Sequence, residues 1–169
     1  PALALGEDPP AKDVMSKRPR PKSEGILKNM GSFVVVSGIM GTIATLAAYF
    51  YGLRVDVAYA GTMAFTTIVV YELILVFNSR QEGKTMFEHS PFTNIWLILA
   101  VLASFVLQLL AVYVPFLDPI FGTEEILLND WGIILGLGML AVLVPKISHL
   151  WNVLKEKRNP HVQVEASLS

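Results

Sequence analysis

Long stretches without charged residues are the feature that most restricts how this chain can fold. No Lys, Arg, Asp or Glu occurs from Asn29 to Leu53, a run of 25 residues, and none occurs from His89 to Leu117 or from Trp131 to Pro145. Between Asp56 and Arg80 the single charge is Glu72. A membrane-spanning helix needs about 20 mostly apolar residues. The sequence therefore predicts four transmembrane helices, near residues 30–53, 58–79, 93–115 and 131–153.

The composition agrees with an all-α chain embedded in a lipid bilayer. Hydrophobic residues make up 53% of the sequence and charged residues 16%, whereas a soluble domain carries about 25% charged residues. The alternative, a soluble bundle, requires helices with polar faces. The absence of Cys excludes disulfides and thiol chemistry, and the net charge of −1 does not favour a nucleic-acid partner. We expect the transmembrane four-helix segment of a polytopic membrane protein.

The distribution of Lys and Arg predicts the orientation of these helices. Six of the 13 basic residues precede the first span and four follow from Lys146 onward, whereas the three connections carry one, two and none. Cytoplasmic segments carry the excess of Lys and Arg. We therefore expect residues 1–29 to form a cytoplasmic loop and residues 154–169 a cytoplasmic tail. The acidic connection after the third span then faces the opposite side.

The first residues carry a recognisable pattern. Pro1–Gly6 reads PALALG, which looks like the end of a truncated membrane helix, and Pro9-Pro10, Asp13–Met15 and Pro19-Arg20 follow. This order resembles the loop after the sixth membrane helix of P-type calcium-transporting ATPases of the reticulum-type branch, where it reads PALALG-x-x-PP-x-x-D-[IV]-M-x-[KR]-PPR. Arg18 departs from the pattern, because Pro is usual there.

The resemblance continues in order over residues 1–158. Further matches are Thr62–Phe65, Glu72, Asn78–Arg80, Asn94–Leu97, Tyr113–Leu117 and Trp131. The resemblance implies that the four spans are the seventh to tenth helices of a calcium pump. It also implies two partners in the same pump, namely the preceding membrane helices and a cytoplasmic phosphorylation domain. ATP and magnesium are implied for the parent protein alone, because neither an Asp-Lys-Thr-Gly-Thr motif nor a P-loop occurs here.

Glu72 is the candidate metal-ligating residue. At a rise of 1.5 Å per residue it lies about 24 Å from Asp56 and about 12 Å from Arg80 along the helix. A carboxylate inside the membrane is costly and is a functional candidate by default. The resemblance implies that Glu72 binds one of two transported calcium ions. The alternative is a protonated structural glutamate bonded to a neighbouring helix. Because calcium takes six to eight oxygen ligands, other helices must supply the rest.

Other polar groups in the spans favour structural roles. Tyr71 is expected to pack or to form an interhelix hydrogen bond, and Gln108 to form an interhelix hydrogen bond. Asn78 is expected to end its helix, and Pro145 to kink the last span. The three scattered His residues show no metal-ligand spacing.

Small residues four apart, Ser37 with Gly41 and Gly132 with Gly136, are expected to let helices approach closely.

Two other functions remain open at this point. The chain could belong to a proton, sodium or potassium pump of the same type, or it could be a stand-alone four-helix scaffold or regulator. The connection at Arg54–Val57 is short and the chain lacks Cys. We therefore expect a prokaryotic cell membrane, with an internal membrane as the second choice.

Overall fold

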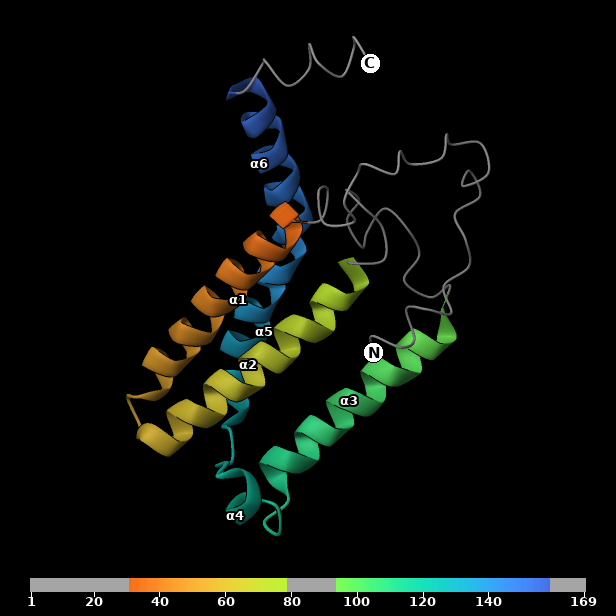
Figure 1. Ribbon diagram of the computed structural model, residues 1–169. Coiled ribbons are helices and arrows are strands. Elements are labelled where there is room, and N and C mark those ends of the chain that lie inside the picture. Colours follow the sequence, from red (N-terminus) through yellow and green to blue (C-terminus); the bar gives the residue numbers. More distant parts are fainter. Residues whose placement is uncertain (1–30, 79–93, 159–169) are drawn as a thin grey trace.

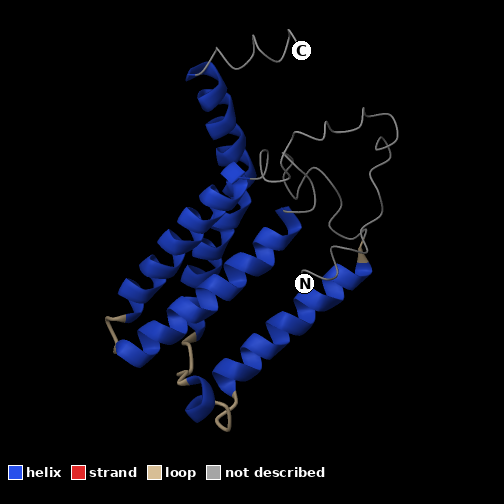
Figure 2. Ribbon diagram, viewed as in Figure 1, coloured by secondary structure: helices blue, strands red, loops and turns tan. Residues whose placement is uncertain are grey.

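The computed structural model describes residues 31–78 and 94–158, and its elements are helices joined by short connections (Figures 1 and 2). In order they are α1 (Gly31–Gly52), α2 (Val57–Asn78), α3 (Ile95–Tyr113), α4 (Asp118–Phe121), η4 (Leu128–Asp130), α5 (Trp131–Gly138), η5 (Met139–Leu143) and α6 (Val144–Arg158). No strand occurs within these two ranges, which confirms the all-α expectation. The expected loop at 1–29 and most of the expected tail, residues 159–169, lie outside the described residues.

Four segments of the described chain are long and apolar enough to cross a membrane. They are Gly31–Gly52, Val57–Asn78, Ile95–Tyr113 and Leu128–Lys155, the last combining η4, α5, η5 and most of α6. Their outward faces are apolar, as on α3, where Leu99, Leu102 and Val106 are each about half exposed. Such faces suit lipid rather than water, so the structure supports a membrane segment over a soluble bundle.

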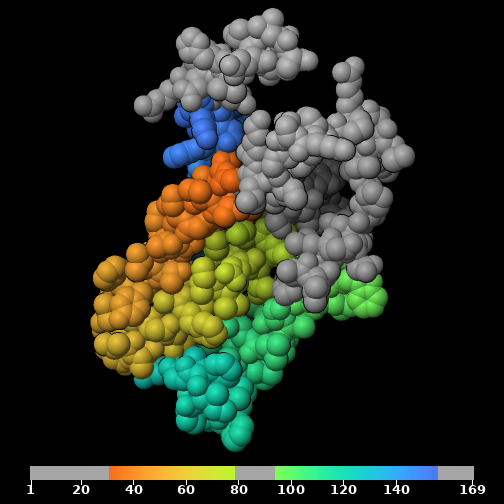
Figure 3. Space-filling view, viewed as in Figure 1, coloured from red at the N-terminus to blue at the C-terminus, as the bar shows by residue number. Residues whose placement is uncertain are grey.

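The second helix, α2, is the centre of the packing. It forms an antiparallel hairpin with α1 and also contacts α5 and η5, whereas α3 lies to one side and contacts α2 less extensively (Figure 1). The space-filling view shows α1 and α2 as one continuous surface with α4 at the far end (Figure 3). Tyr59, Met63 and Val70 place α2 in one buried cluster, and Tyr71 places it in a second. The side chains of α2 are therefore held by several helices at once.

The last span changes its hydrogen-bonding pattern before Pro145. Because Pro145 has no N–H group, it cannot donate to the carbonyl of Ala141 four residues earlier. The chain forms the 3₁₀ turn η5 at Met139–Leu143, and the Ala141 carbonyl accepts from the Val144 N–H. The side-chain amide of Asn78, the last residue of α2, donates to the same carbonyl at 2.8 Å. The last span therefore changes to 3₁₀ hydrogen bonding just before Pro145, where a kink was expected. Asn78 ends its helix, as expected, and links it to the last span.

The ends of α3 follow from local sequence. The Asn94 side chain accepts a hydrogen bond from the Leu97 N–H at 3.0 Å and caps the helix. At the other end Val114 adopts an extended conformation, as residues before a proline do, and Pro115 follows. Residues 114–130 follow, and they are called the outer connection because the distribution of Lys and Arg predicts that they face the non-cytoplasmic side.

Candidate cation-binding site

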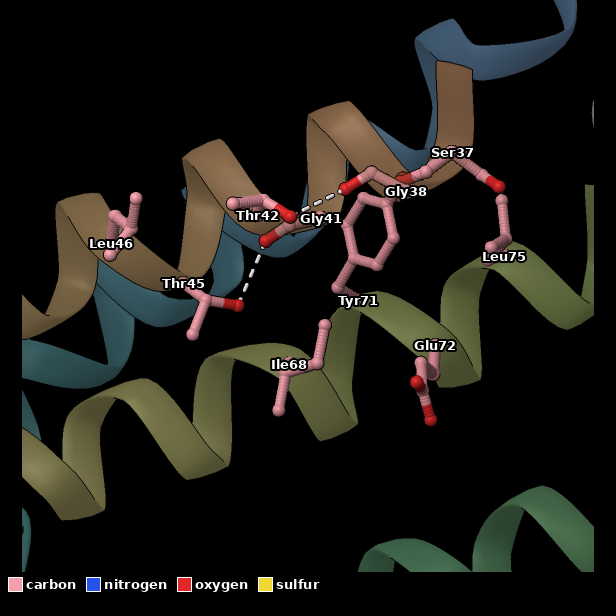
Figure 4. Close-up of a pocket in the computed structure, with 10 residues that line it drawn as sticks. All are labelled: Ser37, Gly38, Gly41, Thr42, Thr45, Leu46, Ile68, Tyr71, Glu72 and Leu75. Carbon is pink, nitrogen blue, oxygen red and sulfur yellow. Dashed lines mark hydrogen bonds between the residues drawn. The ribbon is translucent and has the colours of Figure 1, made fainter. Parts of the chain in front are cut away.

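A pocket of about 340 Å³ lies between α1 and α2 (Figure 4). Its wall combines small and polar residues of α1 with larger residues of α2. The lining residues are Ser37, Gly38, Gly41, Thr42, Thr45, Leu46, Ile68, Tyr71, Glu72 and Leu75. Glu72 is the one charged residue among them.

The hydroxyl groups on the α1 wall are already engaged within their own helix. Thr42 donates to the Gly38 carbonyl and Thr45 to the Gly41 carbonyl, both at 2.8 Å. Such back-bonding is the usual way for threonine to satisfy its hydroxyl inside a helix. The α1 wall therefore contributes mainly space, because its glycines leave the helix backbone open to the pocket.

The side chain of Tyr71 extends from α2 to α1, where it contacts Gly41 and Ser37. Its ring is buried, with 2% of its surface exposed, and its hydroxyl donates to the Ser37 carbonyl at 2.8 Å. A Cβ atom added at Gly41 would lie 3.0 Å from the Cε1 atom of the ring. The expected interhelix hydrogen bond of Tyr71 and the expected close approach at Gly41 are therefore both confirmed.

Glu72 lies next to this contact but leaves α2 in another direction. Figure 4 shows Tyr71 directed toward α1 and the Glu72 carboxylate directed away from it. Adjacent residues of a helix differ by about 100° in direction, which accounts for the difference. The Glu72 side chain is exposed in the described part of the chain, so its carboxylate is free to meet a group from another segment.

A complete metal site is not present among the described residues. No group of three or more His, Cys, Asp or Glu side chains there could hold a metal ion. One carboxylate supplies at most two of the six to eight oxygen ligands that calcium takes. The expected role of Glu72 as a cation ligand stays a prediction, and a complete site would need further oxygen ligands from outside the described residues.

A second polar cluster at the opposite end of α2 is absent from the sequence-based expectations. Asp130 is 8% exposed and accepts hydrogen bonds from the hydroxyls of Tyr59 and Tyr51, the latter at 3.2 Å. The Tyr59 hydroxyl also accepts from the Leu127 N–H at 3.2 Å, and the Arg54 guanidinium lies 4.6 Å from the centre of the Tyr51 ring. This outer cluster fastens the start of α5 to the α1–α2 hairpin.

The comparison with known proteins decides the family. A family model described as "Cation transporting ATPase, C-terminus" matches residues 1–151. The chain belongs to this family. This cation transporting ATPase segment is also similar to part of much longer bacterial and human proteins.

Three relatives show how far this similarity extends. A calcium-transporting ATPase of Bacillus subtilis is 40% identical over 148 residues, and calcium-transporting ATPase 1 of Bacillus cereus is 31% identical over 168. The human calcium-transporting ATPase type 2C member 1 is 34% identical over 170 residues. The alignments cover 85%, 89% and 99% of this chain but 16%, 19% and 18% of the relatives. The segment thus spans less than a fifth of the length of these relatives. It is an integral membrane segment.

Proposed function

We propose that this chain is the carboxyl-terminal membrane segment of an ATP-driven calcium pump, in which Glu72 binds a transported calcium ion. The position of Glu72 is the main support for this proposal. Glu72 is the single carboxylate of α2, it lies in the interior of that helix, and its side chain is exposed beside the pocket. It lies about 9 Å along the helix from the end of α2 at Asn78. A carboxylate at that depth needs protein, water or a cation as its neighbour.

The names of the relatives support calcium as the substrate. The proteins of Bacillus subtilis, Bacillus cereus and human are all named calcium-transporting ATPases. Carboxylate oxygen is a hard ligand that suits calcium. This chain corresponds to less than a fifth of the length of these relatives. The remaining oxygen ligands would come from the rest of the pump.

The other parts of the proposal concern the pump as a whole. ATP and magnesium would act in a cytoplasmic phosphorylation domain, and residues 7–28 would contact that domain. The excess of Lys and Arg in the two ends of the chain supports a cytoplasmic location for both. The four-residue connection Leu53–Asp56 is the observation behind the proposed prokaryotic cell membrane, with an internal membrane as the second choice.

Calcium uptake by the full-length pump tests the role of Glu72. In membrane vesicles we expect Glu72→Gln to lower the apparent calcium affinity by at least about tenfold, equivalent to about 1.4 kcal/mol. Glu125→Gln is the matched control, since Glu125 is an exposed glutamate of the outer connection. Unchanged calcium dependence in Glu72→Gln would refute the proposed ligand. ATP-dependent phosphorylation that responds to sodium, potassium or protons but not to calcium would refute the choice of ion.

A further inference from the structure

The residues just before Glu72 are held by two helices through close contacts at glycine. On one side, a Cβ atom at Gly41 of α1 would lie 3.0 Å from the Tyr71 ring. On the other, a Cβ atom at Gly138 of α5 would lie 2.7 Å from the Cγ1 atom of Val70 and 3.6 Å from the backbone nitrogen of Tyr71. The absence of side chains at these two positions lets α1 and α5 approach the same turn of α2.

The hydroxyl of Tyr71 adds a directional constraint to this packing. It donates to the Ser37 carbonyl at 2.8 Å, so the tyrosine is fixed at its far end as well as along its ring. Rotation of α2 about its axis would stretch this hydrogen bond and press the ring against Gly41. The pair Tyr71 and Gly41 therefore sets the rotation of α2 against α1.

The rotation of α2 determines where the neighbouring carboxylate lies. A side-chain tip about 6 Å from the helix axis moves by about 2 Å when the helix turns by 20°. Calcium–oxygen distances fall in a narrow range of about 2.3–2.6 Å, and binding groups need to be held within about 0.5 Å of their working positions. A small rotation of α2 is therefore enough to take Glu72 out of ligand range.

We propose that Tyr71 is a positioning residue for cation binding: through its ring contact with Gly41 and its hydrogen bond to Ser37, it holds Glu72 in the direction that the ion requires. This inference rests on the proposed function of Glu72. In this proposal Tyr71 does not contact the ion. It affects cation binding by fixing the rotation of α2.

The same helix offers a matched control for this role. Tyr59 is also a buried tyrosine of α2, with 3% of its surface exposed, and its hydroxyl bonds to Asp130 and Leu127. It lies about 20 Å along the helix from Glu72. Tyr59→Phe removes at least as many hydrogen bonds as Tyr71→Phe, so a general loss of stability would affect both variants.

The experiment compares calcium uptake and thermal stability of the full-length pump in Tyr71→Phe, Tyr59→Phe and Glu72→Gln. We expect Tyr71→Phe to lower the apparent calcium affinity about fivefold, the worth of one net hydrogen bond, with the maximal rate unchanged. Tyr59→Phe should lower the melting temperature and leave the affinity unchanged. An affinity shift of equal size in both tyrosine variants would overturn the positioning role.

The result for Glu72→Gln separates the two proposals. If Glu72→Gln impairs calcium binding and Tyr71→Phe does not, the positioning role is wrong and the proposed function stands. If Glu72→Gln itself has no effect, the proposed function is wrong and the positioning role falls with it.

A second pair of variants tests the ring contact without removing the hydroxyl. Gly41→Ala should displace the Tyr71 ring and lower the calcium affinity, whereas Gly61→Ala on α2, where a Cβ atom meets nothing within 4 Å, should not. In a Tyr71→Ala background the Gly41→Ala change should have no further effect on affinity, because the ring is gone. Full additivity of the two changes would contradict the proposed contact.

Discussion

Gln108 of α3 donates a hydrogen bond of 3.0 Å to the Thr66 hydroxyl of α2, and both side chains are buried. This bond joins the helix that lies to one side of the bundle to the helix at its centre. The expected interhelix role of Gln108 is therefore confirmed.

We predict that Gln108→Leu weakens the attachment of α3 to α2. The expected loss is about 0.6 kcal/mol, typical of an interhelix hydrogen bond in a membrane, and it should appear as a lower melting temperature of the full-length protein in detergent. Ser104→Ala is the control, because Ser104 bonds within α3 to the Ala100 carbonyl. Equal melting temperatures for Gln108→Leu and the parent would show that this bond does not hold α3.

A methyl group at Gly138 should force α5 away from α2. The added Cβ atom would lie 2.7 Å from Val70, and overpacking of this kind costs about 1–3 kcal/mol. Gly136→Ala on the same helix, where a Cβ atom meets nothing within 4 Å, should be neutral or gain up to about 1 kcal/mol from helix propensity. Thermal unfolding of both variants measures the difference, and equal stability would argue against close packing at Gly138.

Loss of Asp130 should loosen the outer connection. In Asp130→Leu the buried hydroxyl of Tyr59 and the partly buried hydroxyl of Tyr51 lose their acceptor, and a buried group left unsatisfied costs about 1–3 kcal/mol. We expect a lower melting temperature and faster protease cleavage within residues 114–130. The control Glu125→Leu replaces an exposed carboxylate and should change stability by less than about 0.5 kcal/mol. Cleavage at the parent rate in Asp130→Leu would contradict the fastening role of the outer cluster.

The bond from Asn78 to the last span should depend on Pro145. We expect Asn78→Leu to cost about 1 kcal/mol in the stability of the full-length protein. In a Pro145→Ala background, the restored N–H can donate to the Ala141 carbonyl, so the same change should cost less than half as much. A double-mutant cycle of melting temperatures measures this coupling. Independent effects of the two changes would show that Asn78 does not compensate for the proline.

The sequence predicted the helical segments because the thickness of a bilayer sets the length of an apolar run directly. The same reasoning could identify Glu72, since a carboxylate inside such a run stands out. It could not identify which glycine of α5 meets α2. The expectation for Gly132 and Gly136 is wrong for contacts among the described residues, since a Cβ atom at either meets nothing within 4 Å, and the close contact is at Gly138.

The reason lies in helix rotation. Gly136 and Gly138 differ by about 200° in direction, so their spacing alone cannot say which of them faces a neighbour.

The outer cluster was missed for a related reason. Its tyrosines are 71 and 79 residues from Asp130 in the chain, and no local pattern joins them. Among the described residues no group of three or more His, Cys, Asp or Glu side chains could hold a metal ion, so the ligands that would complete the proposed cation site could not be predicted.

The donor and acceptor that join α2 to the last span are 63 residues apart in the sequence, and this separation has a consequence for assembly in the membrane. Domains and hairpins form in the order of synthesis, beginning with the amino-terminal parts. The α1–α2 hairpin is therefore already inserted when the interrupted helix leaves the ribosome. The segment that Pro145 interrupts is made last, and it enters a bilayer that already contains Asn78, which adds a second donor to the Ala141 carbonyl beside the Val144 N–H.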